Sequence, residues 1–188
     1  QPFPGPGLSI RAVGELTLEK LDVVRRATKI VEERLEGMGL SQWFTAVWEY
    51  EVSPSEDLSR VISDLGRLSA YLFRVRATGV KGDSRSYGNV VLVSGDLSNW
   101  GSVYELYKYL SAMREVTHVV YELMSRDTGR YFVSIRAVLT EDFMTADVAR
   151  LPRDVLIGIA QEIMSSDGRV AAVGYDITPK PPATIEYE

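Results

Sequence analysis

The spacing of apolar residues along the chain separates helical stretches from extended ones. Between Thr17 and Leu35, apolar residues recur at spacings of three, four or seven, which predicts a helix that Thr17 caps. Residues 43–52 are rich in aromatic and β-branched side chains and predict a strand. The pattern then predicts a short helix opened by Pro54 and Ser55, a strand at 71–80 and a polar turn at 81–88.

The rest of the chain repeats one pattern. A strand–helix–strand unit occurs twice, with strands at 87–94 and 118–123 around a helix at 103–114, and strands at 131–138 and 172–177 around a helix at 153–165. Because a solenoid needs at least three repeats, two units indicate two similar halves that face each other. We expect an α+β fold, with small antiparallel or mixed sheets, helices on one face and this repeated unit.

Composition and charge narrow the possible functions. The chain has 188 residues, of which 45% are hydrophobic and 25% charged, as in an ordinary globular protein of one sizeable or two small domains. The net charge of −5 gives no support for nucleic-acid binding, and no apolar run approaches the roughly 20 residues of a membrane span. With no cysteine and with His118 as the single histidine, thiolate zinc sites, disulfides and a histidine-rich metal site are excluded.

Two smaller features concern the origin of the chain. It starts with Gln-Pro-Phe-Pro and lacks an initiating methionine, so we expect it to be cut from a longer polypeptide. Asparagine and glutamine are few, and this depletion of heat-labile residues is typical of a thermophilic source.

Three segments hold residues that could bind an anionic ligand. The glycines of residues 3–7 could present backbone N–H groups to an anion, or the segment is a linker. Asp83 and Arg85 could hold a sugar hydroxyl and a phosphate, or they lie on a solvated hairpin turn. Lys180 and Glu186 lie on an arm that prolines stiffen, unless this end of the chain is disordered.

A complete catalytic centre is missing from the sequence. It has no glycine-rich Walker loop, no SGGxDS pyrophosphatase loop and no nucleophile with a plausible base. His118 lies in an apolar strand and is expected to be a core or cross-strand residue. The segment at 142–146, DFMTA, contains no residue pattern that by itself indicates a reactive site.

Four separated segments together resemble one family. PFPGPGL at the start, VKGDSRSY in the middle, and DFMTA and YDITPKPPATIEYE towards the end are similar to the C-terminal region of GMP synthase. The resemblance implies a part in the ATP-dependent amination of XMP to GMP, a ligase reaction of guanine nucleotide biosynthesis with glutamine as the amide donor. In this family the C-terminal region binds XMP and mediates dimerisation, and the chain alone would be inactive.

The resemblance also implies which residues contact XMP. By position, the XMP-binding residues are Pro4, Gly5, Pro6, Asp83, Arg85, Lys180, Thr184, Ile185 and Glu186. We assign Lys180 and Arg85 to the phosphate, because ammonium and guanidinium groups bind phosphate well. Asp83 would accept hydrogen bonds from ribose hydroxyls, and Glu186 from the N–H groups of the xanthine ring. No residue of this chain is assigned to catalysis or to a metal.

Cofactors and partners follow from the same resemblance. No cofactor is expected in this chain, whereas the full enzyme would use ATP and Mg²⁺. The expected partners are XMP, an ATP-pyrophosphatase domain upstream in the same chain and a glutamine amidotransferase domain or subunit, in the cytoplasm and without nucleic acid or membrane. A stand-alone nucleotide-sensing module and a purely structural dimerisation domain are the alternatives.

The resemblance finally suggests how the chain is organised. We expect an N-terminal part with the long helix and the XMP-binding turn at 1–86, the first unit at 87–129, and the second unit with the XMP-binding tail at 130–188. Many bacterial members lack the first unit, and eukaryotic members have both. The chain would therefore form a homodimer or an intrachain pseudo-dimer. For the latter we expect a pseudo-two-fold axis and buried apolar faces that include Val91, Val93, Val133 and Ile135 or their strand neighbours.

Overall fold

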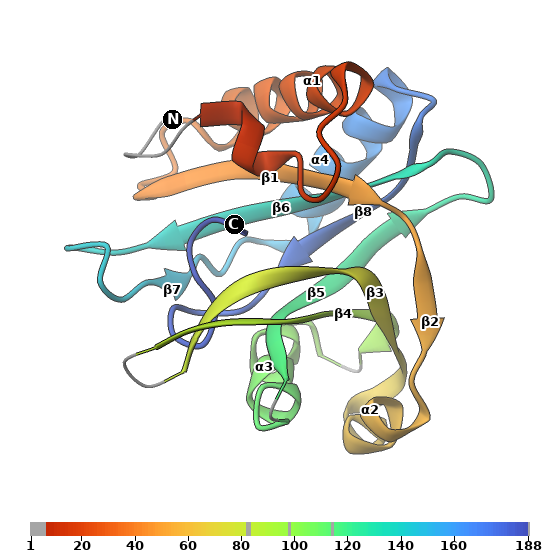
Figure 1. Ribbon diagram of the computed structural model, residues 1–188, viewed down its shortest axis with the longest axis vertical. Coiled ribbons are helices and arrows are strands. Elements are labelled where there is room, and N and C mark those ends of the chain that lie inside the picture. Colours follow the sequence, from red (N-terminus) through yellow and green to blue (C-terminus); the bar gives the residue numbers. More distant parts are fainter. Residues whose placement is uncertain (1–6, 82–83, 98, 114, 188) are drawn as a thin grey trace.

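The computed structural model describes residues 7–81, 84–97, 99–113 and 115–187 (Figure 1). Eight strands form one mixed sheet, in which the strand order is β1-β6-β8-β5-β4-β3-β2 and β7 pairs with β6. The strands are β1 (Gln42–Glu49), β2 (Val52–Pro54), β3 (Gly66–Lys81), β4 (Ser84–Leu97), β5 (Val116–Ser125), β6 (Tyr131–Leu139), β7 (Asp147–Val148) and β8 (Val170–Asp176). The α+β class is confirmed, but the strands form a single large sheet where several small ones were expected.

Helices begin where the sequence offers a capping side chain. The α-helices are α1 (Leu18–Leu35), α2 (Glu56–Val61), α3 (Leu106–Leu110) and α4 (Arg153–Ser166), and 3₁₀ turns lie at η1 (Gly7–Arg11), η2 (Ser63–Leu65) and η3 (Trp100–Glu105). The Thr17 hydroxyl accepts the backbone N–H of Lys20 at the start of α1, and Ser55 caps α2 in the same way. The helix predicted at 103–114 instead starts with η3, which Asn99 caps, and its α-helical part is short.

One predicted turn is largely a strand. Of the residues expected in a polar turn at 81–88, Lys81 and residues 84–88 lie in strands, because β4 begins at Ser84 and pairs in antiparallel register with β3 as far as Lys81 and Ser84. The strand predicted at 87–94 therefore starts three residues earlier, and the exposed side chain of Arg85 obscured this start, since hairpin ends that reach into solvent lack a buried face.

The two strand–helix–strand units lie side by side in the sheet. Within each unit the strands are parallel, β4 with β5 and β6 with β8, and the units meet where β5 pairs antiparallel with β8. Each unit is extended by an earlier strand, because β3 pairs antiparallel with β4 and β1 with β6. A rotation by half a turn that places one unit, with its added strand, on the other would produce this order and these directions of the strands.

The contact between the units differs from the expected one. Val91, Val93, Val133 and Ile135 are buried, but they belong to the apolar cluster that the helices cover. The units meet through backbone pairing of residues such as Tyr121 and Tyr175. A sheet edge supplies unpaired N–H and C=O groups, so strand pairing joins two units without any packing of strand faces.

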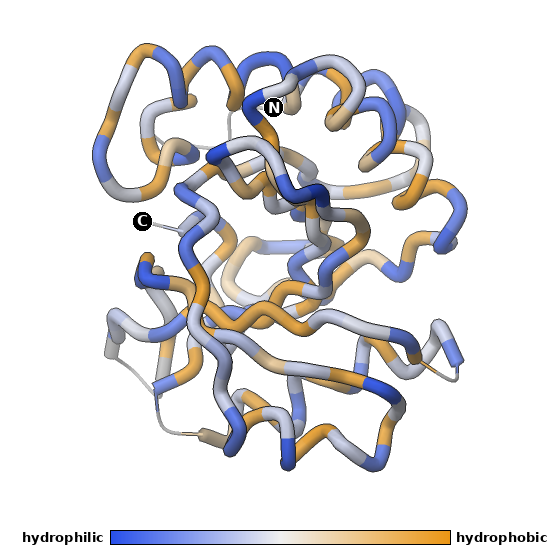
Figure 2. The backbone as a smooth tube through the Cα atoms, turned by 90° about the vertical axis from the view of Figure 1, so that its right-hand side faces the viewer, coloured by the Kyte–Doolittle hydropathy of each residue, from blue (hydrophilic) through white to orange (hydrophobic). Residues whose placement is uncertain are grey.

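Two apolar clusters lie on opposite faces of the sheet. The larger cluster includes residues from all four α-helices and from the strands beneath them. The smaller cluster has strand residues such as Phe44 and Trp48 together with Ile185 and Tyr187 from the C-terminal segment, and no residue from an α-helix. Figure 2 shows strands with long apolar stretches, whereas apolar and hydrophilic residues alternate along the helices. The helices therefore cover one face, and the C-terminal tail covers part of the other.

Candidate functional site

The C-terminal tail, residues 177–187, lies beside the end of the β3–β4 hairpin. Gly79 forms an isolated antiparallel bridge with Ala183, and the Val80 N–H donates to the Pro182 carbonyl over 2.7 Å. The Thr78 N–H donates to the carbonyl of Tyr187 over 2.8 Å. In Figure 1 this segment loops between β7 and the hairpin end. The tail and the hairpin that contains Arg85 are therefore brought together, although they are about a hundred residues apart in sequence.

Lys180 connects the tail to the loop that follows β6. Its backbone N–H and C=O both pair with Ala146, over 2.8 and 3.0 Å. Its ammonium group donates to the Phe143 carbonyl over 2.5 Å. Phe143 has a φ of 59°, the one positive value at a non-glycine position among the described residues. The DFMTA segment, which showed no role in the sequence, thus holds the side chain of Lys180.

Glu186 connects the tail to the N-terminal segment. One oxygen of its carboxylate lies 3.2 Å from the Arg11 guanidinium, and the Gln42 side-chain amide donates to the same oxygen over 3.5 Å. Arg11 itself lies over the ring of Phe44, 4.4 Å from its centroid. The other carboxylate oxygen, Oε2, has no hydrogen-bond partner among the described residues. The Glu186 side chain is 18% exposed, so it lies at the edge of the domain.

Between Lys180 and Glu186, the side chains of Thr184 and Ile185 contact the rest of the domain. The Thr184 hydroxyl lies 2.9 Å from the carbonyl of Thr78 and also contacts that of Glu186. The side chain of Ile185 is buried in the smaller apolar cluster. Their side chains fix the tail to the sheet.

The other residues predicted to contact the nucleotide are placed only in part. The side chain of Arg85 is exposed on β4, where its backbone pairs with Val80 beside the tail. Pro4, Gly5, Pro6 and Asp83 lie outside the described residues. The structure therefore brings Arg85, Lys180 and Glu186 to one end of the sheet.

A buried charged network underlies the tail. Arg136 on β6 and Asp176 at the end of β8 are both fully buried, and a guanidinium nitrogen, Nη1, lies 2.8 Å from the Asp176 carboxylate. The guanidinium also donates to the carbonyls of Thr178, Thr184 and Ile185, over 3.0, 2.8 and 2.7 Å. Sequence reasoning missed both residues. The available signals were an arginine inside the apolar strand YFVSIRAV and an aspartate at the end of another.

His118 and Tyr187 complete this network. The ring of His118 stacks on that of Tyr187 at 4.4 Å, and its Nδ1 lies 2.7 Å from the Asp176 carboxylate. Its Nε2 lies 3.1 Å from the Thr78 carbonyl, so both ring nitrogens face oxygen acceptors. The Tyr187 hydroxyl donates to Asp176 over 2.6 Å. His118 is therefore the buried core residue that the sequence predicted.

These contacts set the protonation of the buried groups. Burial raises the pKa of Asp176, but the charges of Arg136 and His118 and the hydrogen bonds to it outweigh burial, so its pKa is held below the ordinary value. Burial and the negative charge of Asp176 raise the pKa of Tyr187 well above its ordinary value, which keeps its hydroxyl a donor. A carboxylate and a protonated phenol are therefore the stable forms at neutral pH.

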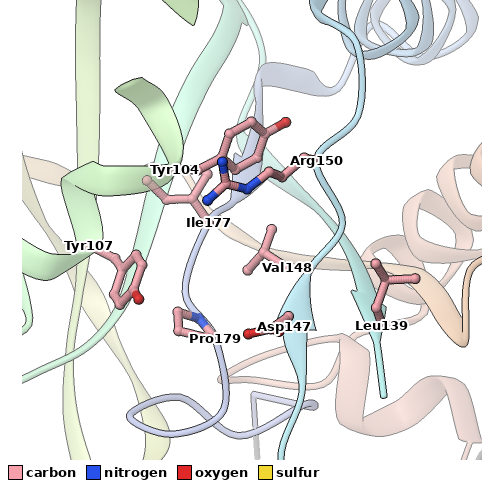
Figure 3. A pocket seen from close by; sticks show the side chains of 8 residues that line it. All are labelled: Tyr104, Tyr107, Leu139, Asp147, Val148, Arg150, Ile177 and Pro179. Atoms are coloured by element: carbon pink, nitrogen blue, oxygen red, sulfur yellow. The ribbon is translucent and has the colours of Figure 1, made fainter. Parts of the chain in front are cut away.

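One surface pocket lies next to the start of the tail, at Ile177 and Pro179. Figure 3 shows this pocket of about 450 Å³, with Arg150 next to Tyr104 on one side and Asp147 and Pro179 on another. Its lining residues are Tyr104, Tyr107, Leu139, Asp147, Val148, Arg150, Ile177 and Pro179. None of them is among the predicted XMP contacts. The shape of this pocket alone therefore does not identify the site formed by the tail.

Two further observations concern other classes of site. Within the described part of the chain, no three His, Cys, Asp or Glu side chains are grouped as metal ligands. None of the helices in that part is both long enough and apolar enough to cross a membrane.

The comparisons with known proteins find one family, and the matched family model includes the DFMTA segment and the C-terminal tail. The family model described as the GMP synthase C terminal domain matches residues 96–187. A GMP synthase (glutamine-hydrolyzing) subunit of Saccharolobus islandicus is 48% identical over 190 residues, which cover 100% of this chain and 48% of that protein. The corresponding subunit of Sulfurisphaera tokodaii is 42% identical over 189 residues and is covered to 49%.

A longer relative shows the same similarity. GMP synthase (glutamine-hydrolyzing) of Thermomicrobium roseum is 36% identical over 188 residues, which make up 24% of that protein. The chain thus spans about half the length of the two subunits and about a quarter of this longer relative. By sequence and by the matched domain, the chain belongs to the GMP synthase family and contains the C-terminal domain of that family.

Proposed function

We propose that the chain binds XMP and serves the conversion of XMP to GMP in a GMP synthase. The observation that carries the proposal is the meeting of four separate segments at one end of the sheet. Backbone hydrogen bonds, a hydrogen bond from the Lys180 ammonium and the Arg11–Glu186 ion pair join the tail to the β3–β4 hairpin, to the DFMTA loop and to the segment at Arg11. These segments include or adjoin those in which the chain resembles the family, and two cationic side chains and a carboxylate lie among them.

The chemistry of these side chains suits a nucleoside monophosphate. In our proposal, Lys180 and Arg85 bind the phosphate, since a cation close to a phosphate forms charge-assisted hydrogen bonds. The Lys180 ammonium donates to a neutral acceptor, the Phe143 carbonyl. A phosphate could take the place of this carbonyl as the acceptor, so that the ammonium would keep a hydrogen-bond partner. Asp83 accepts from the ribose, and the Glu186 carboxylate accepts from the xanthine ring.

The remainder of the reaction is assigned to other parts of the enzyme. ATP with Mg²⁺ would bind in an ATP-pyrophosphatase region, because the sequence of this chain contains no SGGxDS loop. Ammonia would come from a glutamine amidotransferase domain or subunit, as the names of the relatives suggest. We place this reaction in the cytoplasm.

An XMP titration of the purified chain tests the proposal. Lys180→Ala should weaken XMP binding by about 1.5–3 kcal/mol, roughly ten- to a hundredfold, because it removes a charge-assisted contact. Glu186→Gln should also weaken XMP binding, since it removes the negative charge and replaces one acceptor oxygen of the carboxylate with an NH₂ group, which can only donate. Lys29→Ala is the matched control, because Lys29 is an exposed lysine on α1 that pairs only loosely with Glu33 at 3.8 Å.

The outcomes separate the proposal from its rivals. Equal affinity of XMP for the Lys180→Ala and Lys29→Ala variants would remove the tail from the binding site. No measurable binding of XMP to the wild-type protein would favour a purely structural association domain.

A further inference from the structure

The guanidinium of Arg136 joins the two ends of the tail loop. Three of its hydrogen bonds reach tail carbonyls, one at Thr178 and two at Thr184 and Ile185. Lys180 lies between these attachment points, and Glu186 directly follows the second one. The loop from 178 to 185 is therefore closed around one buried side chain.

The Asp176 carboxylate holds the same guanidinium in place. Asp176 binds Arg136 over 2.8 Å and also accepts the backbone N–H of Thr178 through its second oxygen, over 3.0 Å. At the other end of the tail, the Tyr187 hydroxyl donates to the Asp176 carboxylate and lies 2.8 Å from the Ser134 hydroxyl. Arg136 therefore cannot move without the tail, and the tail cannot move without breaking several buried hydrogen bonds.

Stability alone does not explain a charged group at this position. Replacing a buried ion pair by well-packed apolar side chains is often neutral or stabilising, because two charges must be removed from water. A flat guanidinium, however, presents five donors in a fixed geometry, which an apolar side chain cannot imitate. The arrangement therefore serves to fix the path of the tail.

We infer that Arg136, held by Asp176, is a positioning residue of the nucleotide site, which sets the spacing between Lys180 and Glu186. This inference rests on the proposed function, because it assumes that both groups contact one nucleotide. A nucleoside monophosphate has a limited range of distances between its phosphate and its base. Two contacting groups on a closed loop match that range without first ordering the chain, so less entropy is lost on binding.

Arg136→Lys tests the inference directly. Lysine keeps the positive charge beside Asp176, but its single nitrogen cannot donate to three carbonyls in the fork geometry of arginine. We expect XMP affinity to fall about tenfold or more, the change that follows the loss of charge-assisted hydrogen bonds. We also expect faster hydrogen exchange at the Thr78 and Val80 amides, which donate to tail carbonyls.

The chain offers a matched control in Arg126. Its guanidinium also donates to three carbonyls, those of Val170, Met164 and Asp167, over 2.7, 3.1 and 2.7 Å. Arg126 follows β5, at the opposite end of that strand from the tail. Arg126→Lys should lower the free energy of unfolding but leave XMP affinity and the Thr78 and Val80 exchange rates unchanged.

The readouts separate this inference from the proposed function. If wild-type protein does not bind XMP, the proposed function fails, and hydrogen exchange of the two lysine variants still decides whether Arg136 holds the tail. If Arg136→Lys keeps both wild-type XMP affinity and protected Thr78 and Val80 amides, the inference is overturned. The same holds if Arg126→Lys weakens XMP binding as much.

A second variant covers the case in which Arg136→Lys does not fold. The double change Arg136→Met with Asp176→Asn removes both buried charges together, so neither is left unpaired. It should fold, exchange the Thr78 and Val80 amides faster and bind XMP more weakly. Wild-type exchange and affinity in this variant would refute the positioning role.

Discussion

The ionised state of Asp176 depends on the side chains that contact it in the buried network. Three side chains, those of Arg136, His118 and Tyr187, contact its carboxylate in a fully buried position. Residue spacing could not have predicted this, because Arg136 and Asp176 are 40 positions apart and each lies in a strand that looks like core. By contrast, the burial of His118 was predictable from its apolar strand. Lys180 and Glu186 were candidates from their place on a proline-rich arm, and the resemblance to a family motif favoured them over a disordered end.

The network makes a prediction about pH. The pKa of Asp176 is lower in the folded chain than its ordinary value of 3.8, so the ionised form stabilises the fold above about pH 4. This stabilisation is lost as pH falls through the folded-state pKa. Asp176→Asn should cost about 3–5 kcal/mol at pH 7, the cost typical of breaking a buried ion pair.

Urea unfolding of the wild type and Asp176→Asn between pH 7 and pH 3 measures this effect. The difference in unfolding free energy should be constant above about pH 5 and shrink below pH 4, because there Asp176 of the unfolded wild type takes up a proton, whereas an asparagine does not titrate. A difference that stays constant down to pH 3 would show that the carboxylate charge does not stabilise the fold.

Among the elements, those with local signals were predictable and those held by distant contacts were not. Thr17 and Ser55 mark helix starts in the sequence, and both cap helices in the structure. The tail has no local signal of order, because its carbonyls are bound by Arg136, which lies 49 residues before Ile185. Only the resemblance indicated that these residues act together.

The contact between β3 and the tail makes a prediction at Gly79. A Cβ atom there would lie 2.8 Å from the Pro182 carbonyl oxygen and 2.5 Å from a methyl carbon of Thr117. Gly79→Ala should therefore push the tail from β3, lower the unfolding free energy by about 1–3 kcal/mol and weaken XMP binding. Hydrogen exchange at Val80 and an XMP titration measure the two effects.

Gly88→Ala is the control for this change. Its Cβ would crowd the same Thr117 methyl at 2.6 Å and the Glu115 carbonyl at 2.5 Å, but no tail atom is among its nearest neighbours. It should destabilise the chain without changing exchange at Val80 or XMP affinity. Equal loss of XMP affinity in the two alanine variants would mean that crowding around Thr117, and not displacement of the tail, is responsible.

At the scale of the whole molecule, the repeat was visible in the sequence but the way its copies join was not. Hydrophobic periodicity identifies a strand but does not say which strand edge it pairs with. The structure joins the copies through β5 and β8 and adds β1 and β3 from earlier in the chain. Residues Val91 and Val133, expected between the copies, are buried by the helices because alternate residues of a strand point to opposite faces.

This arrangement predicts a monomer in solution. The outer edge of β1 is partly covered, since Ala12 bridges to Val47 and the Val13 N–H donates to the Val47 carbonyl over 2.9 Å. At the other end, β2 has three residues and includes Pro54, which cannot donate to a neighbouring strand. Light scattering after size-exclusion chromatography should give about the chain mass of 21.0 kDa. Twice that mass at micromolar concentration would contradict the prediction.

The most direct test of the account is a crystal structure of the protein with XMP. The account predicts the phosphate within hydrogen-bond distance of Lys180 and Arg85, the xanthine ring beside Glu186, and the tail still bound to Arg136. XMP bound in the pocket lined by Tyr104 and Arg150, or bound with the tail detached from Arg136, would contradict it.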